Sequence, residues 1–181
     1  MRAVEVGADD AFVLARAANI YSSVLNDPRT ADVFADQAIA VNPNFSMAWR
    51  IRGWVSIHLG KHELAIEQFQ YAMRLNPLDP EIYLVEAGLS HANFFLRHFE
   101  VALSWAIKSM ARQNNHDMAM VAAMCSYAML GRVDEAQMML ARRREVREVR
   151  TISLHRTQLS HWPQEHLDLL IEASRIAGVP E

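Results

Sequence analysis

The 181-residue chain is short of several kinds of residue, and each shortage excludes a class of protein. A single cysteine, Cys125, excludes a disulfide framework and is typical of a reducing compartment. No apolar run approaches the roughly 20 residues of a membrane-spanning helix, and the first 25 residues lack the continuous apolar core of a signal peptide. The net charge of −3 gives no indication of generic nucleic-acid binding. We therefore expect a cytoplasmic protein that binds neither membrane nor nucleic acid.

Motifs of catalysis and of metal binding are also missing. The sequence contains no glycine-rich phosphate loop, no HExxH and no GxSxG. His58 and His62 have the spacing of two metal ligands on one helix, but Gly60 lies between them and no third ligand can be identified. We therefore expect no enzymatic activity, no cofactor and no metal site.

What the chain does contain is alanine repeated at a long period. Few glycines and prolines interrupt segments rich in Ala, Leu, Met and Glu, which favour helix. Four alanines recur at intervals of 34, 37 and 34 residues, and we call them the marker alanines of the repeats: Ala31, Ala65, Ala102 and Ala136. The Asn-Pro pairs that end at Pro43 and Pro77 are also 34 residues apart. A period of this size indicates an array of helix pairs, and it is the period of the tetratricopeptide repeat (TPR).

The clearest copy of the repeat covers residues 46–79. Six of its residues match the TPR pattern: Trp49, Gly53, Ala65, Phe69, Ala72 and Pro77. Gly53 permits two helices to approach closely, Phe69 fills the space between them, and the closing proline stops the second helix. Arg52 and Ser56 depart from the pattern, which has an apolar and an aromatic residue at those positions.

The sequence thus predicts an all-α fold: a TPR-type superhelix of about four helix pairs with a C-terminal capping helix. We assign residues 1–9 to an N-terminal tail, residues 10–148 to the array, and residues 149–181 to a linker and the cap. The repeats are expected at 12–45, 46–79, 80–116 and 117–148, and their helices at 10–24, 29–41, 45–58, 62–75, 80–96, 99–112, 116–129 and 133–147. A short helix is expected at 151–159 and the capping helix between Pro163 and Gly178.

The interval of 37 residues means that the third repeat holds three extra residues. Three residues are about one helical turn, so we expect the first helix of this repeat to run one turn longer, through residues 94–96. In the other repeats an Asn or Gly stands five residues before the marker alanine, and these residues tolerate the left-handed conformation that ends a helix. Arg97 takes this place in the third repeat, so we expect its helix to end differently.

Four stretches carry a family resemblance: IRGWVSIHLGKHELAIEQF, HANFFLRHFEVALSWAIKS, AMLGRVDEAQ and SRIAGVPE. They resemble the C-terminal TPR region of bacterial regulators in which a class III adenylate/guanylate cyclase domain or a winged-helix DNA-binding domain precedes the repeats. The chain contains nothing similar to either domain, so the resemblance implies no catalytic residue. It implies, as an alternative function, a regulatory domain that contacts its own upstream domain or self-associates.

The binding surface is expected on the concave face, which the first helix of each pair lines. Inward positions recur at i, i+3, i+7 and i+10 from the second residue of each repeat, and Gly88 is among them. The candidates for a groove that binds a peptide or protein partner are Arg16, Ile20, Met47, Arg50, Trp54, Ile57, Leu84, His91, Met118, Val121 and Cys125. Most of them are apolar, which suits a helix or an extended apolar peptide. An alternative stays open in which Trp54 and Ile57 pack within the stack or beneath residues 149–181, and Cys125 is a core residue.

A run of arginines lies near the end of the array: Arg142, Arg143, Arg144, Arg147 and Arg150. Glu145 and Glu148 interleave with them, which is typical of a solvated helix face. We interpret the run in this way, with an anionic partner as the alternative.

Overall fold

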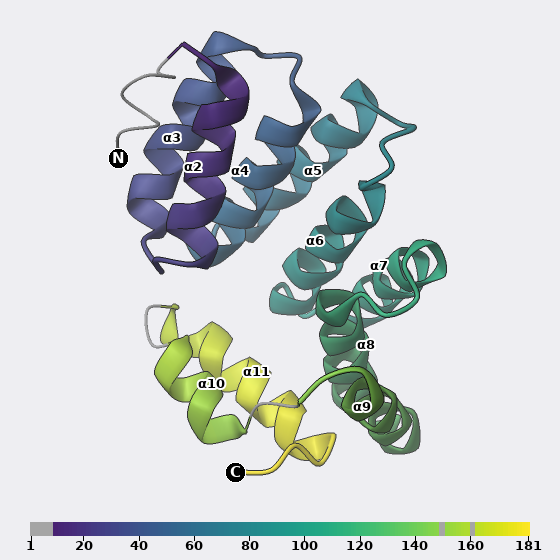
Figure 1. Ribbon diagram of the computed structural model, residues 1–181. Helices are drawn as coiled ribbons and strands as arrows, with labels where there is room; N and C mark the ends of the chain where they lie inside the picture. The colour runs from purple at the N-terminus through teal and green to yellow at the C-terminus, as the bar shows by residue number, and fades with distance from the viewer. Residues whose placement is uncertain (1–8, 149–150, 160–161) are drawn as a thin grey trace. The chain divides into compact units, whose positions relative to one another are not determined.

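The computed structural model of the chain describes residues 9–148, 151–159 and 162–181. These residues form ten α-helices and no strand (Figure 1), so the all-α prediction is confirmed. The helices are α2 (Ala11–Ser23), α3 (Pro28–Val41), α4 (Ser46–His58), α5 (His62–Leu75), α6 (Ile82–Phe95), α7 (Phe99–Arg112), α8 (Asp117–Met129), α9 (Val133–Val146), α10 (Ile152–Gln158) and α11 (Gln164–Ile176). From α2 to α10, each boundary lies within two residues of the predicted one. The predicted tail, apart from Asp9, and Arg150 lie outside the described residues.

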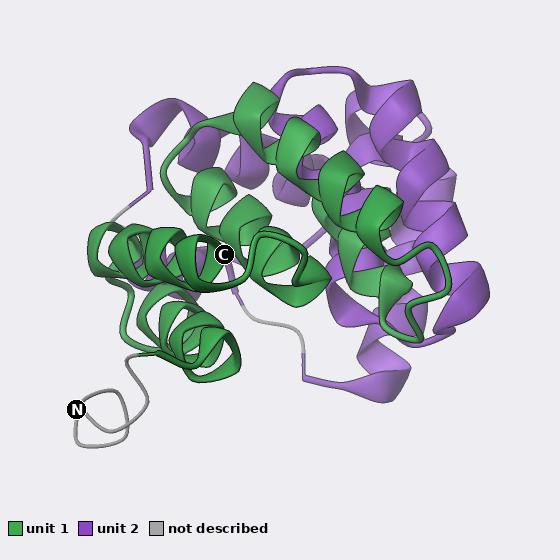
Figure 2. Ribbon diagram, turned by 90° about the horizontal axis from the view of Figure 1, so that it is seen from above, with its two compact units in different colours: residues 1–88 green, residues 89–181 purple. Residues whose placement is uncertain are grey.

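The chain divides into two compact units (Figure 2). Unit 1 comprises residues 1–88 and contains α2 to α5 and the first half of α6. Unit 2 comprises residues 89–181 and contains the rest of α6 and α7 to α11. The first two predicted helix pairs therefore belong to unit 1, and the fourth pair and the C-terminal helices belong to unit 2.

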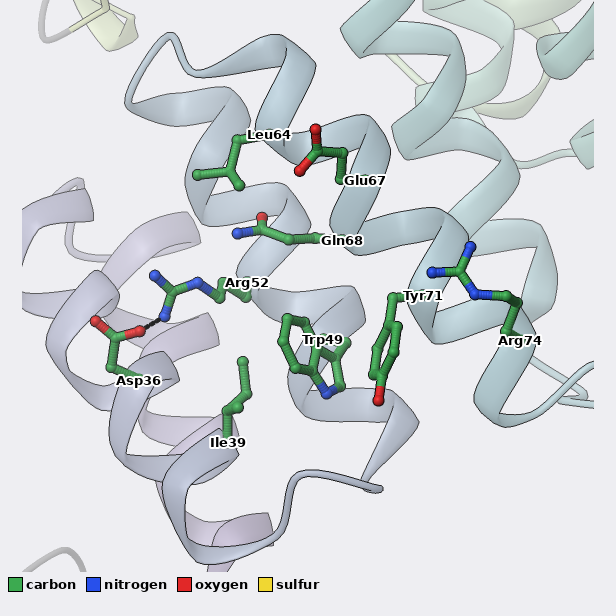
Figure 3. Close-up of a pocket in the computed structure, with 9 residues that line it drawn as sticks. All are labelled: Asp36, Ile39, Trp49, Arg52, Leu64, Glu67, Gln68, Tyr71 and Arg74. Carbon is green, nitrogen blue, oxygen red and sulfur yellow. Dashed lines mark ion pairs between the residues drawn. The ribbon is translucent and has the colours of Figure 1, made fainter.

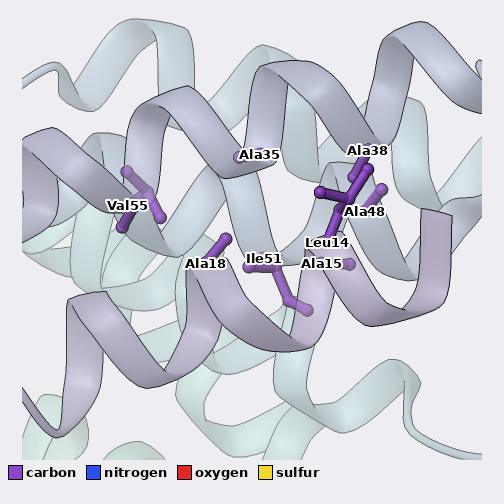
Figure 4. Packing of buried hydrophobic residues seen from close by; sticks show 9 residues of the cluster. Leu14, Ala15, Ala18, Ala35, Ala38, Ala48, Ile51 and Val55 are labelled. Atoms are coloured by element: carbon purple, nitrogen blue, oxygen red, sulfur yellow. The ribbon is translucent and has the colours of Figure 1, made fainter. Parts of the chain in front are cut away.

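The core of unit 1 is built largely from alanine. α2 packs against α3 and α4, and α3 packs against α4. The buried cluster between them comprises Leu14, Ala15, Ala18, Ala31, Ala35, Ala38, Ala48, Ile51 and Val55 (Figure 4). The small side chains let the three helices approach closely, and Leu14, Ile51 and Val55 fill the space that remains. The marker alanine of the first repeat, Ala31, is thus a packing residue.

Phe69 of α5 is fully buried against two glycines of unit 1. A Cβ atom placed on Gly53 would lie 2.6 Å from Cε1 of the Phe69 ring, and one placed on Gly88 would also overlap the ring. Real Cβ atoms do not approach a ring so closely, so both positions need glycine. The predicted role of Gly53 is confirmed. Gly88 faces Phe69, so its assignment to the inward face of the third repeat is wrong.

The first helices of the repeats end in the same way, by a left-handed residue. Asn26, Gly60, Arg97 and Gly131 have φ angles of 54°, 76°, 61° and 74°. After Arg97, the His98 N–H donates to the Asn93 carbonyl at 2.9 Å, as the Lys61 N–H donates to the Ser56 carbonyl at 2.8 Å after Gly60. The expectation that α6 ends differently is therefore wrong. The hydrogen bond that closes the helix offsets the roughly 1–2 kcal/mol that the left-handed conformation costs a residue with a Cβ.

The extra residues of the third repeat lie mostly in a loop. The segment 76–81 before α6 has six residues, whereas 42–45 and 113–116 have four, and α6 has 14 residues against 13 in α4 and α8. The prediction of an extra helical turn is therefore wrong. Pro80 has no amide hydrogen, and the Glu81 N–H donates to the Asp79 side chain at 2.8 Å, so the chain turns here instead of extending the helix.

The left-handed Arg97 gives a stability prediction. We expect Arg97→Gly to raise the free energy of unfolding by about 1 kcal/mol, because glycine adopts this conformation without strain. Arg112→Gly, at an exposed position in the last turn of α7, should instead lower it by about 0.5–1 kcal/mol. Urea denaturation measures both. Equal losses in the two variants would contradict the strain at Arg97.

Candidate protein-binding surface

In unit 1, α2 and α4 lie side by side and carry the first predicted groove residues. On α2, Arg16 is exposed and Ile20 is 45% exposed. On α4, Met47 and Trp54 are half-buried, and Leu84 at the start of α6 is also half-buried. The candidates of unit 1 that a partner could touch are therefore concentrated on α2, with a smaller contribution from α4.

Two other candidates of unit 1 are structural. Arg50 is only 8% exposed, and its Nη2 lies 2.7 Å from Oε2 of Glu81, so it holds α4 to the segment that precedes α6. Ile57 is buried, which agrees with the alternative that it packs within the helix stack. Trp54 is half-buried, and its ring meets the Phe69 ring edge-on at a centroid distance of 5.8 Å. One part of this side chain therefore packs in the core and the other part is open to a partner. The burial of Arg50 and Ile57 does not agree with their expected place in the groove.

In unit 2, the C-terminal helix occupies the face of α8 where Cys125 lies. α11 packs against α8, and burial raises the pKa of the Cys125 thiol to about 12, with the neighbouring Ser174 hydroxyl of α11 acting in the opposite direction. His91 is also buried, whereas Val121 is half-buried and Met118 is exposed. Cys125 is thus a core residue beneath the capping helix and offers no surface to a partner.

The sequence of α11 explains its position. Leu167, Leu170 and Ile171, on the predicted apolar face, are all buried, and left-handed Gly178 ends the helix as expected. Its first turn meets the end of α6, where the Phe95 ring lies 5.2 Å from the His166 ring. Burial lowers the pKa of His166, against the opposing effect of the Glu165 carboxylate.

The arginine run is not simply a solvated face. Arg143 is 3% exposed, and its Nε donates to Oδ1 of Asp117 at 2.6 Å, while Arg147 reaches Oδ2 at 2.6 Å. Burial acts to raise the pKa of the Asp117 carboxyl, but the two arginines together hold it below its usual value. The prediction of a solvated face is therefore wrong for Arg143, which anchors the first residue of α8 to α9. Arg144 is exposed, as predicted.

A pocket of about 480 Å³, which sequence reasoning missed, lies between α3, α4 and α5 of unit 1 (Figure 3). It is lined by Asp36, Ile39, Trp49, Arg52, Leu64, Glu67, Gln68, Tyr71 and Arg74. The only signal for it in the sequence is the departure from the TPR pattern at Arg52 and Ser56. Arg52 pairs with Asp36 and, at 3.7 Å, with Asp32, and the buried Ser56 hydroxyl lies 2.7 Å from the Gln68 side chain. A polar network thus replaces the apolar contacts of the pattern.

Two features are absent from the part of the chain that the structure describes. No group of three or more His, Cys, Asp and Glu side chains there is arranged to hold a metal ion. None of the helices there is both long enough and apolar enough to cross a membrane.

Comparison with solved structures shows the fold. The chain is similar to YrrB, described as a TPR protein with an unusual peptide-binding site, at 20% identity and a TM-score of 0.58 over 97% of this chain and 90% of that one. It is also similar to the type IV pilus biogenesis factor PilW (16% identity, TM-score 0.72, 96% and 77% of the two chains) and to PilF of Pseudomonas aeruginosa (15%, 0.69, 95% and 78%). No protein-family model and no curated protein matches the chain. The fold is that of TPR proteins.

Proposed function

We propose that this TPR-fold chain is a non-catalytic protein-interaction module that binds a peptide or protein partner on α2 and the adjoining surface of α4. The observation that carries the proposal is a row of side chains on α2 at four-residue spacing: Phe12, Arg16 and Ile20. Phe12 is 52% exposed, and the other two are exposed as well. Residues four apart share one face of a helix, so these side chains form one continuous apolar strip with a central guanidinium group.

The composition of this strip supports recognition. Aromatic and arginine side chains are the usual energetic centres of protein interfaces, and exposed apolar patches on soluble domains commonly mark interaction sites. Met47 and Trp54 are half-buried on α4, the helix that packs beside α2, and a flexible Met side chain adapts to a partner's shape. YrrB, which shares the fold, is described as having a peptide-binding site, and the proposal extends that class of ligand to this chain.

The resemblance to regions that follow cyclase or winged-helix domains stays a prediction from the sequence, as does the cytoplasmic location. Under that resemblance the same strip would contact an upstream domain or a second copy of the chain. The mass of a cross-linked adduct distinguishes these partners from an unrelated protein.

A photo-crosslinking amino acid placed at position 20 tests the proposal in the native cells. We expect discrete adducts from position 20 and none of the same mass from position 101, which is similarly exposed on α7 in unit 2. Ile20→Glu should reduce recovery of the partner by about tenfold or more, and change the free energy of unfolding by only about 0.5 kcal/mol. Absence of discrete adducts at position 20, or full recovery with Ile20→Glu, would overturn the proposal.

A further inference from the structure

We propose that the pocket between α3, α4 and α5 is a second binding site, which takes the cationic side chain, an arginine or a lysine, of a basic peptide segment. It is separate from the strip on α2. Trp49 and Arg52 of the pocket lie on the opposite face of α4 from Met47 and Trp54, as the 100° rotation per helical residue requires. A failure of this site would therefore leave the proposal for α2 intact.

Two aromatic side chains, Trp49 and Tyr71, form one part of the pocket lining. The centroids of the Trp49 and Tyr71 rings lie 4.6 Å apart, with 58° between the ring planes (Figure 3). The Trp49 Nε1–H donates a hydrogen bond to the Pro43 carbonyl at 2.8 Å, which fixes the indole. Aromatic faces attract cations. The chain already uses this attraction here, because the Arg74 guanidinium lies 5.3 Å from the centre of the Tyr71 ring. Because the Arg74 guanidinium already covers a face of the Tyr71 ring, we expect an incoming cation to lie against the Trp49 ring.

Carboxylates lie in and beside the pocket on two of its helices. Asp32 and Asp36 on α3, and Glu63 and Glu67 on α5, form two carboxylate pairs at four-residue spacing, so each pair shares one helix face. The cations among them are Arg52 and Lys61, which pair with the aspartates. The pocket itself is lined by two carboxylates, Asp36 and Glu67, and by two cations, Arg52 and Arg74. Asp36 pairs with Arg52, so the exposed Glu67 is the carboxylate of the lining that is left for an incoming cation.

The contacts of the pocket's arginines disfavour an anionic ligand. Two arginines line the pocket: Arg74 lies over the Tyr71 ring, and Asp32 and Asp36 already take the terminal nitrogens of Arg52. With the Gln68 amide oriented to satisfy its neighbours, the oxygen of that amide accepts from Nε of Arg52 at 3.0 Å. An acidic side chain would have to displace these acceptors in the presence of Glu67. A cation instead meets a free carboxylate, an aromatic face and the apolar walls of Ile39 and Leu64, which suit an aliphatic stem.

The test uses the full chain labelled with ¹⁵N and two small probes, N-acetyl-arginine N-methylamide and N-acetyl-glutamate N-methylamide. The indole Nε1–H of Trp49, assigned by its loss in Trp49→Phe, reports on the pocket. We expect the arginine probe to shift this signal saturably and the glutamate probe, at equal ionic strength, to leave it unchanged. Saturation by both probes, or by neither, would overturn the proposal.

Glu67→Gln provides the matched variant, because it removes one exposed charge without touching the Arg52 network. It should weaken binding of the arginine probe by about threefold, as expected for loss of one solvent-accessible ion pair. Glu172→Gln, at an exposed glutamate of α11 in unit 2, should leave binding unchanged. Equal weakening in both variants would show attraction to the overall charge of the protein and would contradict a site at Trp49.

Discussion

Removal of residues 163–181 should unfold part of unit 2 and cause the chain to aggregate. The deletion takes away α11, and with it the burial of Leu167, Leu170 and Ile171, each of which contributes roughly 1.5–3 kcal/mol. Their sum is comparable with the roughly 5–15 kcal/mol that stabilises a whole domain. The face of α8 beneath the helix would be exposed to solvent, and an uncovered terminal repeat is prone to association.

The single cysteine makes this result easy to measure. Cys125 is buried beneath α11, and burial holds its pKa far above neutrality, so the intact protein should react slowly with a thiol reagent. In the truncated chain we expect the rate to rise by roughly tenfold or more, together with a lower melting temperature. Glu172→Ala, an exposed change on the same helix, is the control and should alter neither quantity. A truncated chain that stays monomeric, melts normally and protects Cys125 would mean that α11 is not a cap.

Gly53→Leu and Gly88→Leu should each destabilise unit 1, by about 3 kcal/mol. Overpacking a core ordinarily costs about 1–3 kcal/mol, and here the Phe69 ring has little room to withdraw, since it is fully buried between the two glycines. Each new side chain would overlap the ring from its Cβ onward. Thermal and urea denaturation measure the loss.

The control for this pair is Ala111→Leu, at an exposed position of α7, which should change the free energy of unfolding by less than about 0.5 kcal/mol. A second variant separates overlap with Phe69 from a general effect of larger side chains in helices. The double variant Gly53→Ala/Phe69→Leu should lose less stability than the sum of the losses in the two single variants. The smaller Leu side chain at position 69 leaves room for the methyl group of the new Ala. Strictly additive losses would show that the two positions do not interact.

The helices could be predicted closely because their signals are local. The left-handed Asn or Gly at a helix end and the closing proline each act within one repeat. The period of the marker alanines then transfers the register of one copy to the others. The same rules failed where a local preference was outweighed. Arg97 adopts the left-handed conformation despite its Cβ, because the closing hydrogen bond from His98 to Asn93 forms there as in the other repeats. The extra residues entered a loop, because Pro80 favours a turn.

The binding surface was less predictable, since helix phase gives the direction of a side chain but not what covers it. Arg16 and Ile20 stay exposed on α2, whereas Cys125, at an equivalent position on α8, lies beneath a helix about 50 residues later in the chain. Likewise, Glu81 holds Arg50 from 31 residues away.

The sequence by itself determined the all-α repeat, its register, the helix boundaries and the close contact at Gly53. Helix ends and small packing residues are properties of short segments, and the period repeats these segments along the chain. Only the tertiary structure decided which inward residues remain at the surface, that α11 covers Cys125, and that Arg52, Trp49 and Tyr71 line one pocket. Burial and ion pairing depend on residues brought together from separate helices. The spacing of residues along one helix does not contain that information.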